Sequence, residues 1–175
     1  MAEPVTIRDA AEADVQAIAR VHVAAWRESY AGLIRPDILA GLSVEDRGRM
    51  WRSALAEPRP GFRLLVAETG GAVVGLGAAG PARPGLLGTE AEIFALYLLD
   101  RIKRRGVGRR MMAGLLGHLR EAGFGFVGLW AFADNAPACR FYEALGAARG
   151  EAQGMEFGGQ RLVEIAYRFE PIPEL

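Results

Sequence analysis

The sequence has very little cysteine and histidine, and it carries no net charge. Its 175 residues include one cysteine, Cys139, and two histidines, while 21 basic residues balance 21 acidic ones. A single cysteine excludes an internal disulfide and a thiolate cluster for structural zinc, so we expect no metal site. The balanced charge argues against a general nucleic-acid-binding protein, which concentrates basic residues.

Long apolar segments are also missing. No uninterrupted apolar run approaches the roughly 20 residues that span a bilayer, and the N-terminal stretch Met1–Asp14 carries acids where a signal peptide has basic and then apolar residues. We therefore expect a soluble, cytoplasmic protein without a membrane partner. The chain is 51% hydrophobic, enough for a sizeable core, and its length fits one domain, which we place at residues 4–171.

Hydrophobic periodicity predicts a mixture of helices and strands. Helical spacing predicts helices over 12–27, 43–57 and 107–122, and a shorter helix over 135–146, with Ser43 as one N-cap and Asp134 or Asn135 as another. Apolar runs predict strands over 5–8, 62–68, 72–80, 92–99, 126–132, 148–156 and 161–169. Residues 30–41 and 81–88 are glycine- and proline-containing loops. This pattern indicates one mixed α/β domain with a largely antiparallel sheet and a βαβα segment in its second half.

The most informative stretch covers residues 96–112 and reads L-Y-L-L-D-R-I-K-R-R-G-V-G-R-R-M-M. It is a strand, a basic turn with two glycines, and a long amphipathic helix. The N-terminus of a helix presents free N–H groups and partial positive charge, and Gly106 and Gly108 let a phosphate approach the backbone closely. The stretch therefore predicts an anion site, although a solvated basic loop would have the same composition.

Two other phosphate-binding patterns fail. The only lysine, Lys103, is not placed for a P-loop. Gly75, Gly77 and Gly80 match the dinucleotide pattern G-x-G-x-x-G, but Pro81 follows directly, so no helix begins there to meet a pyrophosphate. The match is a chance feature of a glycine-rich strand.

Residues 103–108, K-R-R-G-V-G, resemble the [Q/R]-x-x-G-x-[G/A] signature of the GCN-related N-acetyltransferase (GNAT) superfamily. Lys103 stands where the family usually has glutamine or arginine, and Asp100 replaces a frequent proline. Residues 134–146, D-N-A-P-A-C-R-F-Y-E-A-L-G, are similar to the family's second cofactor motif. The resemblance extends over nearly the whole chain and identifies 4–171 as one N-acetyltransferase domain.

The resemblance implies a mixed, mostly antiparallel sheet of about seven strands flanked by about four helices and splayed between the fourth and fifth strands. It implies acetyl-coenzyme A as cosubstrate, held mainly by main-chain groups, and a possible homodimer. The implied cofactor-binding residues are Leu96, Leu98, Lys103, Arg104, Arg105, Gly106, Val107, Gly108, Arg109, Asn135 and Tyr142.

The family comparison also implies catalytic and acceptor-binding residues. Tyr142, seven positions after Asn135 and so on the same helix face, would protonate the departing thiolate. Glu92 would take the proton of the attacking amine, with Glu90 or a water chain as alternatives, because an alkylammonium must first lose a proton. The residues expected at the acceptor are Arg27, Glu28, Tyr30 and Trp130.

These features predict an enzyme that moves the acetyl group of acetyl-coenzyme A to a primary amine of a small molecule or peptide by direct attack. A covalent route through Cys139 is less favoured, because no histidine partner stands near it in the sequence. Two alternatives remain at this point: a non-catalytic acyl-coenzyme A sensor with the same fold, and a nucleic-acid-binding module that uses the basic turn.

Overall fold

The structure is a computed structural model that describes residues 3–84 and 88–175. The first two residues of the acidic N-terminal stretch and residues 85–87 of the predicted loop 81–88 therefore lie outside the description. The described ranges form one sheet of seven strands: β1 (Thr6–Asp9), β2 (Arg63–Thr69), β3 (Ala72–Pro81), β4 (Ala91–Leu98), β5 (Val127–Phe132), β6 (Ala148–Phe157) and β7 (Gln160–Phe169).

Five α-helices and two short 3-10 turns accompany the sheet within the same ranges. They are α1 (Val15–Ser29), α2 (Pro36–Ala40), α3 (Val44–Ala56), α4 (Val107–Glu121), α5 (Ala136–Ala144), η1 (Glu12–Asp14) and η2 (Asp100–Ile102). The strand order is β1-β2-β3-β4-β5-β7-β6, antiparallel except between β4 and β5. The predicted mixed, mostly antiparallel fold is confirmed, and the short α2, inside the predicted loop 30–41, is a fifth helix beside the four expected.

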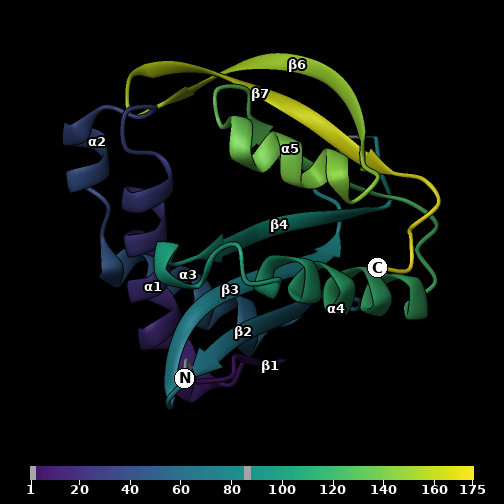
Figure 1. Cartoon of the computed structure of the whole chain (residues 1–175), viewed down its shortest axis with the longest axis horizontal. Helices are drawn as coiled ribbons and strands as arrows, with labels where there is room; N and C mark the ends of the chain where they lie inside the picture. Colours follow the sequence, from purple (N-terminus) through teal and green to yellow (C-terminus); the bar gives the residue numbers. More distant parts are fainter. Residues whose placement is uncertain (1–2, 85–87) are drawn as a thin grey trace.

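Helices cover both faces of the sheet (Figure 1). One core, with α1 and α3, contains Val15, Ile18 and Trp51 against β2, β3 and β4. The other core contains the buried side of α4, including Met111 and Leu115, and residues of α5, β5 and β7. The amphipathic patterns of the predicted helices therefore produce two separate apolar layers with the sheet between them.

The parallel strands β4 and β5 separate soon after they begin. Among the described residues they pair only at Ala91 with Val127 and Glu92 with Gly128. Beyond Glu92, the backbone groups on this edge of β4 need water or a ligand as partners. This is the splay expected between the fourth and fifth strands.

A bulge in β4 changes which side chains face each core. Its pairing with β3 shifts between Ala78 and Ala79, so that Phe94 is an extra residue. Before the bulge Ile93 packs into the α4 core, whereas after it Leu98 does. The bulge therefore reverses the alternation of β4 where the strand reaches the splay.

Local sequence signals explain the helix starts. Ser43 caps α3, because its Oγ accepts a hydrogen bond from Asp46 N at 3.1 Å, and Asn135 Oδ1 caps α5 through Ala138 N at 3.3 Å. Helix α4 differs: its N-cap, Gly106, is left-handed at φ 75° and offers no side chain to the first-turn N–H groups. These groups remain available for an external anion.

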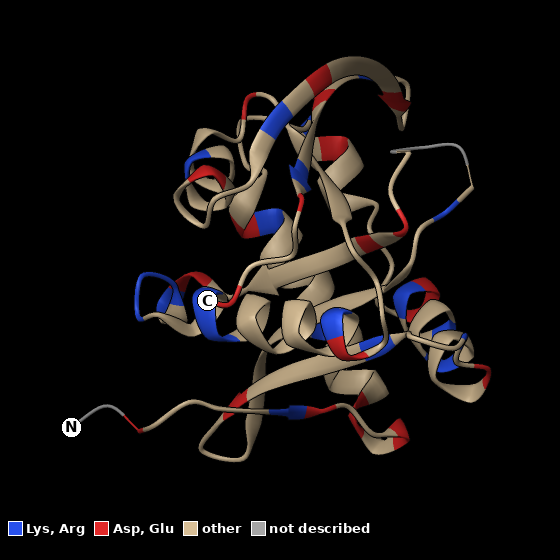
Figure 2. Ribbon diagram, turned by 90° about the vertical axis from the view of Figure 1, so that its right-hand side faces the viewer, with Lys and Arg blue, Asp and Glu red and all other residues tan. Residues whose placement is uncertain are grey.

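Charged residues of both signs are interspersed along the helices and loops, while the central strands are largely uncharged (Figure 2). In the described part of the chain, no group of three or more His, Cys, Asp or Glu side chains could hold a metal ion. None of the helices described is both long and apolar enough to cross a membrane.

Candidate active site

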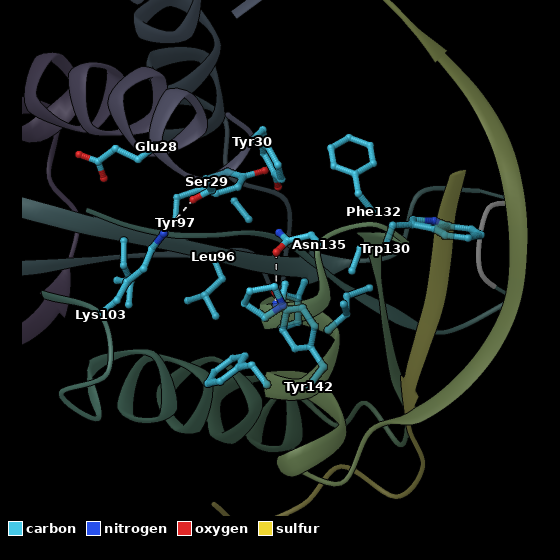
Figure 3. A pocket seen from close by; sticks show the side chains of 18 of the residues that line it. Glu28, Ser29, Tyr30, Leu96, Tyr97, Lys103, Trp130, Phe132, Asn135 and Tyr142 are labelled. Carbon is cyan, nitrogen blue, oxygen red and sulfur yellow. Dashed lines mark hydrogen bonds between the residues drawn. The ribbon is translucent and has the colours of Figure 1, made fainter. Parts of the chain in front are cut away.

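A cavity of about 590 Å³ occupies the splay between β4 and β5 (Figure 3). Its walls come from the end of α1, from β4, from the turn before α4, from β5 and from α5. The lining residues are Glu28, Ser29, Tyr30, Ile93, Phe94, Ala95, Leu96, Tyr97, Leu98, Asp100, Lys103, Arg104, Leu129, Trp130, Ala131, Phe132, Asn135, Pro137, Ala138, Phe141 and Tyr142.

The open edge of β4 presents main-chain donors and acceptors to this cavity. Leu99 N donates to Val74 O on β3 at 3.0 Å. Because successive N–H groups of a strand point to opposite edges, the N–H of Leu98 faces β5 and the splay. Leu96 and Leu98 both line the cavity, as predicted for residues that pair with an extended ligand.

The basic turn lies at one end of the cavity. Lys103 and Arg104 line it, and Arg104 has a left-handed backbone at φ 59°, close to that of Gly106. The other predicted phosphate residues follow outside the lining, at the start of α4. Val107 is 1% exposed, so it can meet a ligand only through its backbone. The remaining members of this group are Arg105, Gly106, Gly108 and Arg109.

Lys103 does not extend freely toward the α4 N-terminus. Its ammonium donates to Ser29 Oγ at 2.9 Å and pairs with Asp100 Oδ1 at 2.7 Å. Asp100 N in turn donates to Glu28 Oε2 at 2.7 Å. The single lysine therefore ties the cofactor turn to the end of α1, where the sequence alone suggested only a phosphate contact.

Helix α5 brings Asn135 and Tyr142 to the same cavity, as their seven-residue spacing predicts. Figure 3 shows both side chains directed into it. Tyr142 is 9% exposed, and its burial raises the pKa of the phenol well above its ordinary value. The hydroxyl is therefore protonated at neutral pH and can act as a proton donor.

Both candidate base residues lie elsewhere. Glu92 is 1% exposed and stands outside the cavity lining, with its carboxylate bound by the Arg83 guanidinium, including Nε at 3.0 Å. Glu90 precedes β4 and accepts a hydrogen bond from Gly125 N at 2.7 Å. Neither carboxylate is placed to take a proton directly from an amine in the cavity.

Of the four residues expected at the acceptor, three line the cavity and one does not. Glu28, Tyr30 and Trp130 line the cavity. Arg27 does not: its guanidinium turns to carbonyl oxygens at the end of α2, with Nε donating to Leu39 O at 3.0 Å. Arg27 thus holds the segment after α1 in place, whereas we expected it at the acceptor.

Several cavity residues were not predicted. Phe94 and Tyr97 are on β4, Phe132 ends β5, and Ser29 ends α1. The strand E-I-F-A-L-Y-L-L contains two of these aromatic residues, Phe94 and Tyr97, so the sequence indicated part of the aromatic lining. The sequence pattern could not show which of these aromatics face the splay, because that depends on the bulge.

A parallel pair of strands that separates beside an uncapped helix N-terminus, with a largely buried tyrosine lining the gap, fits a site for acyl transfer from an acyl-coenzyme A. The family model described as "Acetyltransferase (GNAT) family" matches residues 20–147. The chain therefore belongs to the GNAT family and is an acyl-coenzyme A-dependent N-acetyltransferase.

Individual proteins that this chain resembles are also named as acetyltransferases or have the same fold. The uncharacterized N-acetyltransferase YuaI of Bacillus subtilis (strain 168) is 32% identical over 161 residues, which cover 92% of this chain and 90% of YuaI. The crystal structure of a ribosomal-protein-alanine N-acetyltransferase from Brucella melitensis matches with a TM-score of 0.74 and 26% identity, covering 94% of this chain and 99% of that one. The structure of yncA from Salmonella typhimurium with its cofactor acetyl-CoA has the same fold, with a TM-score of 0.72 and 20% identity over 95% of this chain and 94% of that one.

Proposed function

We propose that this acetyltransferase moves the acetyl group of acetyl-coenzyme A to a primary amine of a small molecule or peptide by direct attack. The observation that carries the proposal is the cavity between β4 and β5, which joins the basic turn before α4 to the Tyr142 hydroxyl. The name of the Brucella relative, a ribosomal-protein-alanine N-acetyltransferase, also suggests a peptide or protein amine as the acceptor.

The residues present fit the cosubstrate. A Cβ built on Gly106 would meet nothing within 4 Å, so a phosphate can approach the first turn of α4 without obstruction. We propose that the main chain from Gly106 to Arg109 holds the pyrophosphate, with Arg104 and Arg105 adding positive charge. The open edge of β4 at Leu96 and Leu98 would hold the pantetheine arm, and Asn135 would contact the cofactor from α5.

Acetyl-coenzyme A supplies, when bound, an acetyl thioester that an amine can attack. Leu98 N–H, directed into the splay, is a donor for an oxygen that gains negative charge. Tyr142 Oη holds a proton for the sulfur. We propose that water in the cavity takes the amine proton, since Glu92 is bound to Arg83 and could accept it only through such a relay.

The test is turnover with a library of primary amines and short peptides. We expect release of free coenzyme A together with products about 42 mass units heavier than the amine, the mass of an acetyl group less that of the hydrogen it replaces. Acetyl-coenzyme A that binds but is not consumed with any member of the library would contradict the proposal and favour the sensor.

A further inference from the structure

The tip of the β6–β7 hairpin is attached to the segment that follows α1. The side-chain amide of Gln160 makes two hydrogen bonds there: Nε2 donates to Leu33 O at 2.9 Å, and Oε1 accepts from Arg35 N at 2.8 Å. Figure 1 shows the hairpin arching across the molecule to reach α2. One side chain thus joins parts of the chain that are more than 120 residues apart in sequence.

Apolar contacts reinforce this attachment. A Cβ on Gly158, in the hairpin turn, would lie 3.0 Å from side-chain atoms of Ile38 on α2, and the backbone there is left-handed at φ 57°, so the close turn favours glycine. Phe157 packs against Trp26 of α1, with ring centroids 5.4 Å apart. The hairpin tip therefore packs against both α1 and α2.

Next to this contact, two aromatic side chains at the wall of the cavity meet between α1 and β5. Tyr30 and Phe132 both line the cavity and meet edge to face, with centroids 5.1 Å apart. Trp26 supports Tyr30 at 5.0 Å. Burial raises the pKa of Tyr30 well above its usual value, which agrees with a ring enclosed by its neighbours. We name the Tyr30–Phe132 contact the aromatic bridge.

The Gln160 attachment holds both ends of the aromatic bridge. Leu33 N donates to Tyr30 O at 3.0 Å, so the carbonyl that Gln160 binds belongs to the turn that begins at Tyr30. On the other side, β7 starts at Gln160 and pairs Glu164 with Phe132. Displacement of the hairpin tip would therefore move Tyr30 and Phe132 apart.

We propose that Gln160 is a positioning residue that keeps the aromatic bridge closed and thereby restricts acceptors to slender primary amines. An amine on a linear chain, including the free end of an extended peptide, can enter beside the bridge. A bulky amine would have to separate Tyr30 from Phe132 and break the two Gln160 hydrogen bonds. This inference rests on the proposed amine acetyltransferase activity.

The experiment compares n-butylamine with 1-adamantylmethylamine as acceptors, through the ratio of their kcat/KM values. We expect the parent enzyme to favour n-butylamine and Gln160→Ala to lower the ratio at least fivefold. Gln160→Glu keeps the oxygen that accepts from Arg35 N but loses the donor to Leu33 O, so its ratio should lie between the two. Tyr30→Ala, which removes the bridge itself, should lower the ratio as Gln160→Ala does.

Gln153→Ala is the matched control. Gln153 Nε2 donates to the side chain of Glu164 at 2.7 Å within the hairpin, whereas Glu164 pairs with Phe132 through its backbone. Within the described residues, Gln153 makes no side-chain hydrogen bond to the segment after α1. Its ratio should stay within twofold of the parent, and calorimetry should give all variants the parent's affinity for acetyl-coenzyme A.

A ratio in Gln160→Ala equal to that of the parent would overturn the inference, whether activity with both amines is retained or falls equally. An equal fall accompanied by a lower unfolding midpoint would indicate a structural role alone. Either result leaves the proposed function standing. If the parent acetylates neither these amines nor any other member of the library, the proposed function itself fails.

Discussion

At the scale of single residues, burial shifts the pKa of two side chains with different roles. Tyr142 is buried at the cavity wall, and its raised pKa keeps the phenol protonated. His22 is 5% exposed in the α1 core, where its Nδ1 accepts a hydrogen bond from Trp51 Nε1 at 3.0 Å and its ring stacks on Tyr97. The same physical effect thus prepares a proton donor at one position and fixes a neutral ring at the other.

We expect Tyr142→Phe to lower turnover by roughly tenfold or more, as the loss of a general acid does. The affinity for acetyl-coenzyme A should be unchanged, because the aromatic ring remains in its packing site. Stopped assays of free thiol give kcat, and calorimetry gives the affinity. Turnover equal to that of the parent would remove Tyr142 from the mechanism.

His22 should make stability sensitive to mild acid. Burial, assisted by the charge of Arg47, lowers the pKa of His22 to about 3, whereas an unfolded histidine takes up its proton near pH 6.5. As the pH falls below 6.5 the unfolded state gains a proton that the folded state does not bind, so the free energy of unfolding should drop by about 2 kcal/mol between pH 7 and 5.

Urea denaturation of the parent and of His22→Gln at both pH values checks this expectation. Glutamine keeps a hydrogen-bond acceptor for Trp51 but does not titrate. The variant should therefore lose less stability on acidification than the parent does. Equal losses in the two proteins would assign the pH dependence to other groups.

A third single residue, Glu92, is expected to act mainly in stability, because its carboxylate is bound by Arg83. The carboxylate is bound by Arg83 in the sheet interior, so Glu92→Gln should lower the unfolding midpoint while reducing turnover less than Tyr142→Phe does. Thermal unfolding and kcat measured on the same preparation check both parts. A loss of turnover as large as that of Tyr142→Phe, with the midpoint unchanged, would return Glu92 to the proton transfer.

At the scale of secondary-structure elements, the N-terminus of α4 is the feature on which the proposed cofactor binding depends. Its N-cap is a left-handed glycine without a capping side chain, and no acidic residue occupies its first turn. The first turn of α4 therefore adds no negative charge to the site that its dipole and its free N–H groups face.

We expect Gly106→Asp to weaken the binding of coenzyme A by at least tenfold, because it places a negative charge where the pyrophosphate should lie. Gly106→Asn is the matched control, since asparagine has nearly the same shape and also tolerates a left-handed backbone. Calorimetric titration should show a much smaller loss for asparagine. Equal affinities for the aspartate variant and the parent would mean that the pyrophosphate lies elsewhere.

The elements also show what the sequence could and could not predict. Gly106 and Asn135 were found because the positions at helix starts have strong chemical preferences. Glu92 was expected as the base because the family resemblance implies a glutamate at this place, and the sequence could not show that Arg83 binds the carboxylate outside the cavity lining. The bulge at Phe94, which decides which later side chains of β4 reach the splay, was not predicted either. The partners of Arg27 at the end of α2 become its neighbours only in the folded chain, so the sequence could not show where its guanidinium turns.

At the scale of the whole molecule, the two apolar cores pack on opposite faces of the sheet in which the site forms. One core packs α1 and α3 on β2, β3 and β4, and the other packs α4 and α5 against residues of β2 to β5 and β7. The cavity lies where β4 and β5 diverge, and the β6–β7 hairpin reaches α2 (Figure 1). The overall architecture thus has the proposed cofactor side at α4 and the proposed acceptor side at the aromatic bridge.

A crystal structure with bound acetyl-coenzyme A tests this account most directly. We predict the pyrophosphate against the main chain of residues 104–109, the pantetheine arm along β4 at Leu96 and Leu98, and the sulfur beside Tyr142 Oη. A cosubstrate bound outside the gap between β4 and β5, or one whose sulfur points away from Tyr142, would contradict it.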